Sequence, residues 1–115
     1  MDRILIIDDE PNSALALGMV LYERGYEVRV EKDSGRALQA VREFQPQAVL
    51  IDFMMPKADG GEVAWQLHGD PAFNDTQLIL YSEISPEELR SKLPARDIPI
   101  LEKPVDGEQL LRLLE

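Results

Sequence analysis

The fold is decided near the N-terminus by the stretch Ile4-Leu5-Ile6-Ile7-Asp8-Asp9-Glu10-Pro11. Four consecutive apolar residues, most of them β-branched, are typical of a strand that is buried on both faces. Acidic residues end this strand, and the proline that follows suits the first position of a helix. A buried strand that passes directly into a helix is the repeating unit of α/β proteins with a parallel sheet.

The same alternation of strand and helix continues to the end of the chain. Further strands are predicted at residues 26–30, 48–51, 78–81 and 98–101, each followed by a helical pattern, and the last helix runs from about Asp106 to Glu115. The strand at 26–30 alternates polar and apolar residues, which is typical of a half-exposed edge strand. The pattern therefore predicts an α/β fold, (βα)5, with a doubly wound parallel five-stranded sheet and helices on both faces.

Composition excludes several classes of function. The chain has 115 residues, which is the usual size of one domain, and a formal net charge of −10. This charge argues against direct binding to nucleic acid and against a polybasic hold on a membrane. Cysteine is absent and His68 is the only histidine, so a disulfide scaffold, a Cys-based zinc site or a His-rich metal site is not expected. The apolar run near the N-terminus is too short for a signal peptide or a membrane span, so the expected location is cytoplasmic.

Polar side chains follow four of the predicted strands. Asp8 and Asp9 come after the first strand, Asp52 after the third, Ser82 after the fourth and Lys103 after the fifth. Because the carboxyl ends of parallel strands share one edge of the sheet, these side chains are expected to lie together. Ligands bind at this edge in open α/β folds, at the point where the strand order reverses.

Three carboxylates at one edge repel one another, so either one of them takes a proton or a cation lies among them. Oxygen ligands of this kind suit Mg²⁺, which keeps several waters and accepts phosphate oxygens as further ligands. A carboxylate can also act as a nucleophile and form an aspartyl-phosphate. Asp52 is the candidate nucleophile, because it stands alone at its strand end with Asp8 and Asp9 on one side and Lys103 on the other.

With these residues in view, the chain resembles the receiver domain of two-component response regulators. The matching pieces occur in the family's order along the whole chain: Ile6-Ile7-Asp8-Asp9-Glu10-Pro11, Val49-Leu50-Ile51-Asp52, Met55-Pro56, Asp59-Gly60, Ser82, and Lys103-Pro104. No single piece is specific, but the combination is. The resemblance implies a flavodoxin-like fold with the strand order 2-1-3-4-5.

The resemblance also implies a role for each matching residue. Asp52 accepts a phosphoryl group from a phosphohistidine of a sensor histidine kinase or a histidine phosphotransfer protein. Asp8, Asp9 and Asp52 hold Mg²⁺, with Asp9 the nearer of the first two, and the backbone carbonyl of Met54 is a further ligand.

Lys103 and Ser82 are implied to contact the phosphoryl group once it is attached. The peptide bond between Lys103 and Pro104 is usually cis in this family. Such a domain is a switch with only weak autophosphorylation and autodephosphorylation activity, and it signals to a downstream output domain or protein. A weak homodimer is left open.

Three positions depart from the family's pattern. Ile100 stands where the family usually has a tyrosine or phenylalanine that moves inward on activation. Glu83 follows Ser82, where a small residue is usual, and Gly61 replaces a bulky apolar residue. The first two departures place the usual output switch in question and leave the phosphorylation site itself intact.

The chain is interpreted as a single receiver domain over residues 1–115, with a last helix that is short for the family, as in a chain that continues into a longer protein. A second reading is a pseudo-receiver, an interaction module without regulated phosphorylation. A third is a Mg²⁺-dependent phosphohydrolase, which ranks lower because Met54 occupies the position of the second acid that such enzymes need. A flavin site is weaker still, since no phosphate-binding loop follows the first strand.

Overall fold

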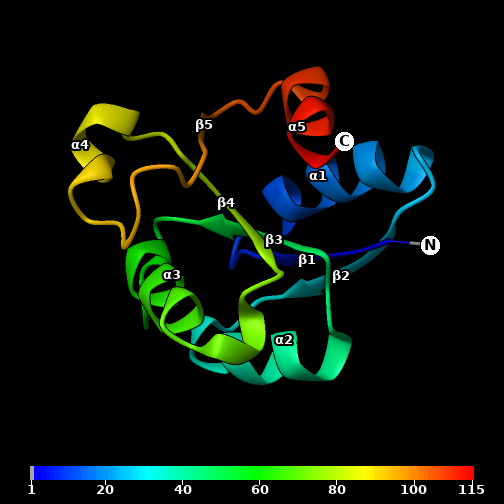
Figure 1. Ribbon diagram of the computed structural model, residues 1–115. Helices are drawn as coiled ribbons and strands as arrows, with labels where there is room; N and C mark the ends of the chain where they lie inside the picture. Colours follow the sequence, from blue (N-terminus) through cyan, green and yellow to red (C-terminus); the bar gives the residue numbers. More distant parts are fainter. Residues whose placement is uncertain (1) are drawn as a thin grey trace.

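The computed structural model describes residues 2–115. Strands and helices alternate along the chain (Figure 1), with two short 3₁₀ helices, η1 and η2, between them. The strands are β1 (Arg3–Ile7), β2 (Glu27–Glu31), β3 (Ala48–Asp52), β4 (Gln77–Ser82) and β5 (Ile100–Glu102). The helices are α1 (Pro11–Glu23), η1 (Ser34–Arg36), α2 (Ala37–Phe44), α3 (Gly60–His68), η2 (Pro71–Phe73), α4 (Pro86–Arg90) and α5 (Gly107–Leu114).

All strands are parallel and lie in the order β2-β1-β3-β4-β5. This confirms the predicted fold class and strand order. The chain moves from β1 outward to β2 and then returns to the other side of β1 as β3, so the order reverses between β1 and β3. Asp8 follows β1 directly and Asp52 ends β3, which places both acids at the reversal point where open α/β sheets bind ligands.

The sheet separates two apolar cores, because alternate residues of a strand face opposite sides. Helices α1 and α5 cover one face, and α2 and α3 cover the other (Figure 1). The α1/α5 core includes Ile4, Ile6, Leu50, Ile79, Tyr81 and Leu101. The α2/α3 core includes Leu5, Ile7, Val49, Ile51, Leu78 and Leu80. Burial on both faces explains why the inner strands of the sheet are continuously apolar.

Two strands begin later than the sequence predicts. The second strand is predicted at residues 26–30, and β2 runs one residue later, from Glu27 to Glu31. The fifth strand was predicted at residues 98–101, but β5 begins only at Ile100, because Pro99 has no amide to donate and joins the sheet only through its carbonyl, which accepts from the Leu80 amide. Helix α4 begins after Ser85, whose side chain accepts from the Glu88 amide, and ends at Arg90. The Arg90 guanidinium donates to backbone carbonyls beyond the helix, at Arg96 and Ile98.

A compact contact joins α3 to the segment between α4 and β5. The indole Nε1 of Trp65 donates to the Lys92 carbonyl at 2.9 Å. The Lys92 ammonium lies over the Phe53 ring, 5.7 Å from its centroid, and the ring edge packs against Gly61. A side chain larger than alanine at position 61 would therefore meet the Phe53 ring.

Gly60 begins α3 where the chain passes closest to the end of β3. A Cβ atom at Gly60 would lie 2.6 Å from the Asp52 carbonyl oxygen and 2.7 Å from the Phe53 Cα. Since both neighbours are backbone atoms, they cannot move aside without displacing β3. Gly60→Ala is therefore expected to lower the free energy of unfolding by about 2–3 kcal/mol in urea titrations.

Gly61→Ala is the matched control for this substitution. A Cβ at Gly61 would approach nothing closer than 3.2 Å, and the nearest atoms belong to the side chains of Asp59 and Phe53. The expected change is below about 1 kcal/mol, because alanine also favours the helix. Equal losses in the two variants would contradict the close approach of Gly60 to β3.

No helix among residues 2–115 has both the length and the apolar character needed to cross a membrane.

Candidate functional site

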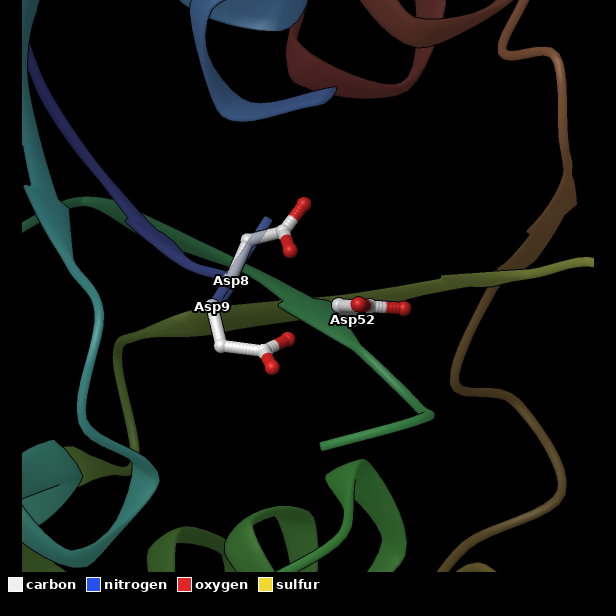
Figure 2. A group of neighbouring side chains, drawn as sticks. All are labelled: Asp8, Asp9 and Asp52. Atoms are coloured by element: carbon white, nitrogen blue, oxygen red, sulfur yellow. The ribbon is translucent and has the colours of Figure 1, made fainter. Parts of the chain in front are cut away.

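Three carboxylates meet at the carboxyl edge of the sheet. Asp8, Asp9 and Asp52 each offer an oxygen atom, and these oxygens lie within 4.8 Å of one another. Figure 2 shows the Asp8 and Asp9 side chains extending from the end of β1 toward the side on which Asp52 lies at the end of β3. Asp8 and Asp52 are buried, whereas Asp9 is exposed. The structure thus brings together the three acids that the sequence analysis selected.

Lys103 lies on the other side of Asp52. Its ammonium nitrogen is 3.2 Å from Asp52 Oδ1, and its backbone amide donates to the Ser82 carbonyl at 2.9 Å, which ties the end of β5 to the end of β4. The peptide bond between Lys103 and Pro104 is cis, as the resemblance implied. Lys103 therefore lies beside Asp52, as the sequence analysis expects.

Ser82 and Met54 lie at the same edge of the sheet. Ser82 is fully buried at the end of β4, and its hydroxyl oxygen accepts from the Ile84 amide at 3.0 Å. Met54 follows β3 with an exposed side chain, and its amide approaches Asp52 Oδ1 at 3.4 Å. The role predicted for the Met54 carbonyl as a metal ligand, and the role of the Ser82 hydroxyl toward a phosphoryl group, stay predictions.

The charge state of Asp52 reflects its surroundings. Burial raises the pKa of Asp52 from its usual 3.8 to about 6, and the charge of Asp8 acts in the same direction. Lys103 opposes both effects without cancelling them. A nearby cation would remove much of the penalty on the charged form, because it compensates both the lost solvent and the repulsion.

The donor set fits Mg²⁺. Carboxylate oxygens from three residues converge, no nitrogen or sulfur ligand lies among them, and the exposed Asp9 leaves one side accessible to water. Mg²⁺ binds proteins through one or two carboxylates and keeps several waters, so an open cluster of this kind suits it better than a closed cage. Asp8, Asp9 and Asp52 are the side chains that would hold the ion.

Tyr81 belongs to the site although the sequence analysis treated it only as part of a strand. Its hydroxyl donates to Asp8 Oδ2 at 2.5 Å, and its side chain is almost completely buried. Burial raises the pKa of Tyr81 far above its usual value, and the hydrogen bond to Asp8 adds to this effect, so the hydroxyl stays a donor. The period of two along strands could have indicated this position, because it places Tyr81 on the same face of the sheet as Asp8, Asp52 and Lys103.

Comparison with known proteins identifies the family. Residues 4–115 match the response regulator receiver domain. The chain is 32% identical over 117 residues to protein PilH of Pseudomonas aeruginosa, covering 99% of this chain and 95% of PilH. It is 43% identical over 68 residues to the DNA-binding response regulator MtrA of Mycolicibacterium smegmatis, covering 59% of this chain but only 30% of MtrA.

A solved structure supports the same assignment. Response regulator TrrA of Thermotoga maritima, in complex with Mg²⁺-BeF, superposes with a TM-score of 0.83 at 27% identity, over 99% of this chain and 96% of TrrA. The chain therefore belongs to the response regulator receiver domain family of two-component systems. Receiver domains are phosphoacceptor switches rather than metabolic enzymes, and they bind Mg²⁺ at an acidic pocket.

Proposed function

We propose that this domain is a switch in which Asp52 accepts a phosphoryl group from the phosphohistidine of a sensor histidine kinase or a histidine phosphotransfer protein. In the transfer, an Asp52 carboxylate oxygen attacks phosphorus and forms the new P–O bond. The P–N bond of the phosphohistidine breaks, and the imidazole nitrogen keeps its electron pair. The observation that carries the proposal is the buried Asp52 carboxylate, 3.2 Å from the Lys103 ammonium and beside two further acids.

The surrounding residues support this reaction through charge and position. Asp8, Asp9, Asp52 and the Met54 carbonyl would hold Mg²⁺, which when bound offsets the negative charge of the phosphoryl oxygens. Lys103 is already paired with Asp52 and can follow the phosphoryl group. Ser82 can offer its hydroxyl to a phosphoryl oxygen from the next strand. In a buried site, the positive charge of Lys103 stabilises nearby negative charge more strongly than it would in water.

A small phosphodonor tests the proposal without a known kinase. Acetyl phosphate with Mg²⁺ is expected to add one phosphoryl group to the protein, as measured by intact mass, and EDTA is expected to prevent the addition. Peptide mapping of the trapped acyl phosphate should place the group on Asp52. An unchanged mass with Mg²⁺ at saturating donor would reject the proposal.

The two aspartates after β1 are expected to differ in their contribution to metal binding. Asp9→Ala should weaken Mg²⁺ binding more than Asp8→Ala, because the resemblance makes Asp9 the nearer of the two ligands. Asp9 is exposed, and no hydrogen bond or ion pair of its side chain is found among residues 2–115. Calorimetric titration of both variants with Mg²⁺ measures the difference. Equal losses of affinity would contradict the assignment of Asp9 as the nearer ligand.

A second candidate function is a pseudo-receiver that binds partners without regulated phosphorylation. Two observations favour it: Ile100 on β5 replaces the family's aromatic ring, and Glu83 follows Ser82. Ile100 is only partly buried and, with its stiff β-branch, offers less differential contact between two states than a ring would. Two-dimensional NMR with Mg²⁺ and beryllofluoride separates the two candidates, because a switch responds at Asp52 and beyond it, and a pseudo-receiver does not.

The partners follow from the same proposal. A phosphohistidine protein supplies the phosphoryl group, a downstream output domain or protein reads the state, and a weak homodimer is an alternative form of output. The net charge of −10 disfavours direct contact of this domain with nucleic acid or anionic membrane. We place this signalling in the cytoplasm and propose residues 1–115 as one receiver unit that catalyses its own phosphorylation and dephosphorylation only weakly.

A further inference from the structure

Tyr81 shares its face of the sheet with the charged groups of the site. Residue 81 is paired in register with Asp52 on β3 and with Leu101 on β5. Alternation along the strands directs residues 79 and 81 to the α1/α5 side, together with Asp52 and Lys103. The tyrosine is 1% exposed, so its hydroxyl needs a partner inside the protein.

The hydroxyl finds that partner in Asp8. The Tyr81 hydroxyl donates to Asp8 Oδ2 at 2.5 Å, and the Glu10 amide donates to Asp8 Oδ1 at 2.8 Å. Both oxygens of the Asp8 carboxylate are therefore held by donors from different elements, β4 and the start of α1. A carboxylate fixed in this way has little freedom to rotate, and each oxygen keeps a lone pair for another contact.

The aromatic ring contacts the opposite charge. The Lys103 ammonium lies 5.3 Å from the centroid of the Tyr81 ring and 3.2 Å from Asp52 Oδ1. This distance to the ring is within the range of a cation–π interaction. One side chain thus contacts an acid of the cluster through its hydroxyl and the cation beside Asp52 through its ring.

We propose that Tyr81 is a positioning residue of this site, whose hydroxyl sets the orientation of Asp8 for Mg²⁺ and whose ring supports Lys103 beside Asp52. The inference rests on the proposed function, because it concerns the metal and the phosphoacceptor. Substitution of groups that hold metal ligands in place typically lowers metal affinity by about ten- to a hundredfold. The ring and the hydroxyl act on different residues, so different substitutions separate their effects.

Tyr81→Phe removes the hydroxyl and keeps the ring. Half-saturation by Mg²⁺ is expected to need about tenfold more ion, the low end of the range for partners of metal ligands. The maximal rate of phosphorylation by acetyl phosphate at saturating Mg²⁺ should stay within about twofold of the unmodified protein, since Lys103 keeps its ring. Tyr81→Leu removes both contacts and should lower the maximal rate as well. A residue that only supported folding would change the folded fraction and leave half-saturation by Mg²⁺ unaltered.

Tyr26→Phe is the matched control. Tyr26 directly precedes β2 and packs, partly buried, against the same core, and no hydrogen bond from its hydroxyl is found among residues 2–115. This variant should leave Mg²⁺ binding unaltered. The decisive comparison uses Asp8→Ala as background, because alanine has no acceptor for the Tyr81 hydroxyl. If the hydroxyl acts through Asp8, Tyr81→Phe should raise the Mg²⁺ concentration for half-saturation by less than about twofold in this background, because the two substitutions remove the same interaction. An equal effect in both backgrounds would overturn the inference.

A spectroscopic measurement needs neither a phosphodonor nor a substituted Tyr81. The buried hydrogen bond from the Tyr81 hydroxyl to Asp8 Oδ2 has an oxygen–oxygen distance of 2.5 Å. A hydroxyl proton in such a bond is expected to exchange slowly with water and to resonate downfield in the NMR spectrum. This resonance should shift on addition of Mg²⁺ and move upfield in Asp8→Asn. Its absence, or its indifference to bound Mg²⁺, counts against the inference. Because Mg²⁺ binding is read here without phosphorylation, a failure of phosphoryl transfer at Asp52 remains distinguishable from a failure of the role of Tyr81.

Discussion

Asp52→Asn is expected to abolish phosphorylation by acetyl phosphate while the domain stays folded. The substitution keeps the shape of the side chain and an oxygen for the Lys103 ammonium, which lies 3.2 Å from Asp52 Oδ1. An amide is not a nucleophile toward phosphorus under these conditions, so no P–O bond can form at this position. The measurement is intact mass after incubation with Mg²⁺ and donor, with thermal unfolding as the check on folding.

Asp75→Asn is the control for this experiment. Asp75 is exposed and precedes β4, so it lies at the opposite edge of the sheet. Its substitution should leave phosphorylation unaltered. If Asp52→Asn were phosphorylated to the same extent as Asp75→Asn, another residue would be the acceptor and the proposed mechanism would be wrong.

The second large effect concerns stability and pH in the presence of EDTA. Burial and Asp8 raise the pKa of Asp52 from 3.8 to about 6, so between these values the folded protein holds a proton that the unfolded chain has released. Stability therefore falls as pH rises through this window, and the loss is complete above pH 6. This displacement of the Asp52 pKa sets an upper limit of about 3 kcal/mol on the loss in the free energy of unfolding, because part of it depends on the charge of Asp8. Urea unfolding at a series of pH values measures it.

Asp52→Asn should remove this part of the pH dependence, so the difference between the two curves isolates Asp52. The lowered pKa of the exposed Asp33, which accepts from Lys57, acts in the opposite sense and below pH 3.8, outside the window. Mg²⁺ favours the charged form and should restore stability more at pH 7 than at pH 5, where it competes with the proton. Parallel curves for the two proteins would show that Asp52 is not titrating in this range.

Much of the fold and site follows from local patterns. Buried strands can be predicted from the sequence because their residues are apolar on both faces. The acids can be selected because they follow those strands at one end. Asp8 and Asp52 come together as predicted, since parallel strands bring their carboxyl ends to one edge. This reasoning needs only the order of elements, which the sequence states directly.

Other features depend on contacts between distant residues. The late start of β5 depends on which backbone groups of Pro99 can hydrogen-bond to β4. Helix α4 ends at Arg90, whose guanidinium donates to a backbone carbonyl beyond the helix, at Arg96. The alternation along β4 can place Tyr81 on the same face as Asp8, but the hydrogen bond between them appears only in the structure, where the hydroxyl lies 2.5 Å from Asp8 Oδ2. Packing and strand register decide such contacts, and neither can be predicted from a local sequence pattern.

The bridge between Trp65 and the Lys92 carbonyl gives the domain a built-in optical probe. Trp65 is the only tryptophan of the chain, so its emission has a single source. The indole joins α3 to the segment before β5, and any change in their separation alters one hydrogen bond of the fluorophore. Intrinsic fluorescence therefore reports movement on this side of the molecule without a label, and it allows rapid-mixing kinetics of the response to ligands at the carboxyl edge of the sheet.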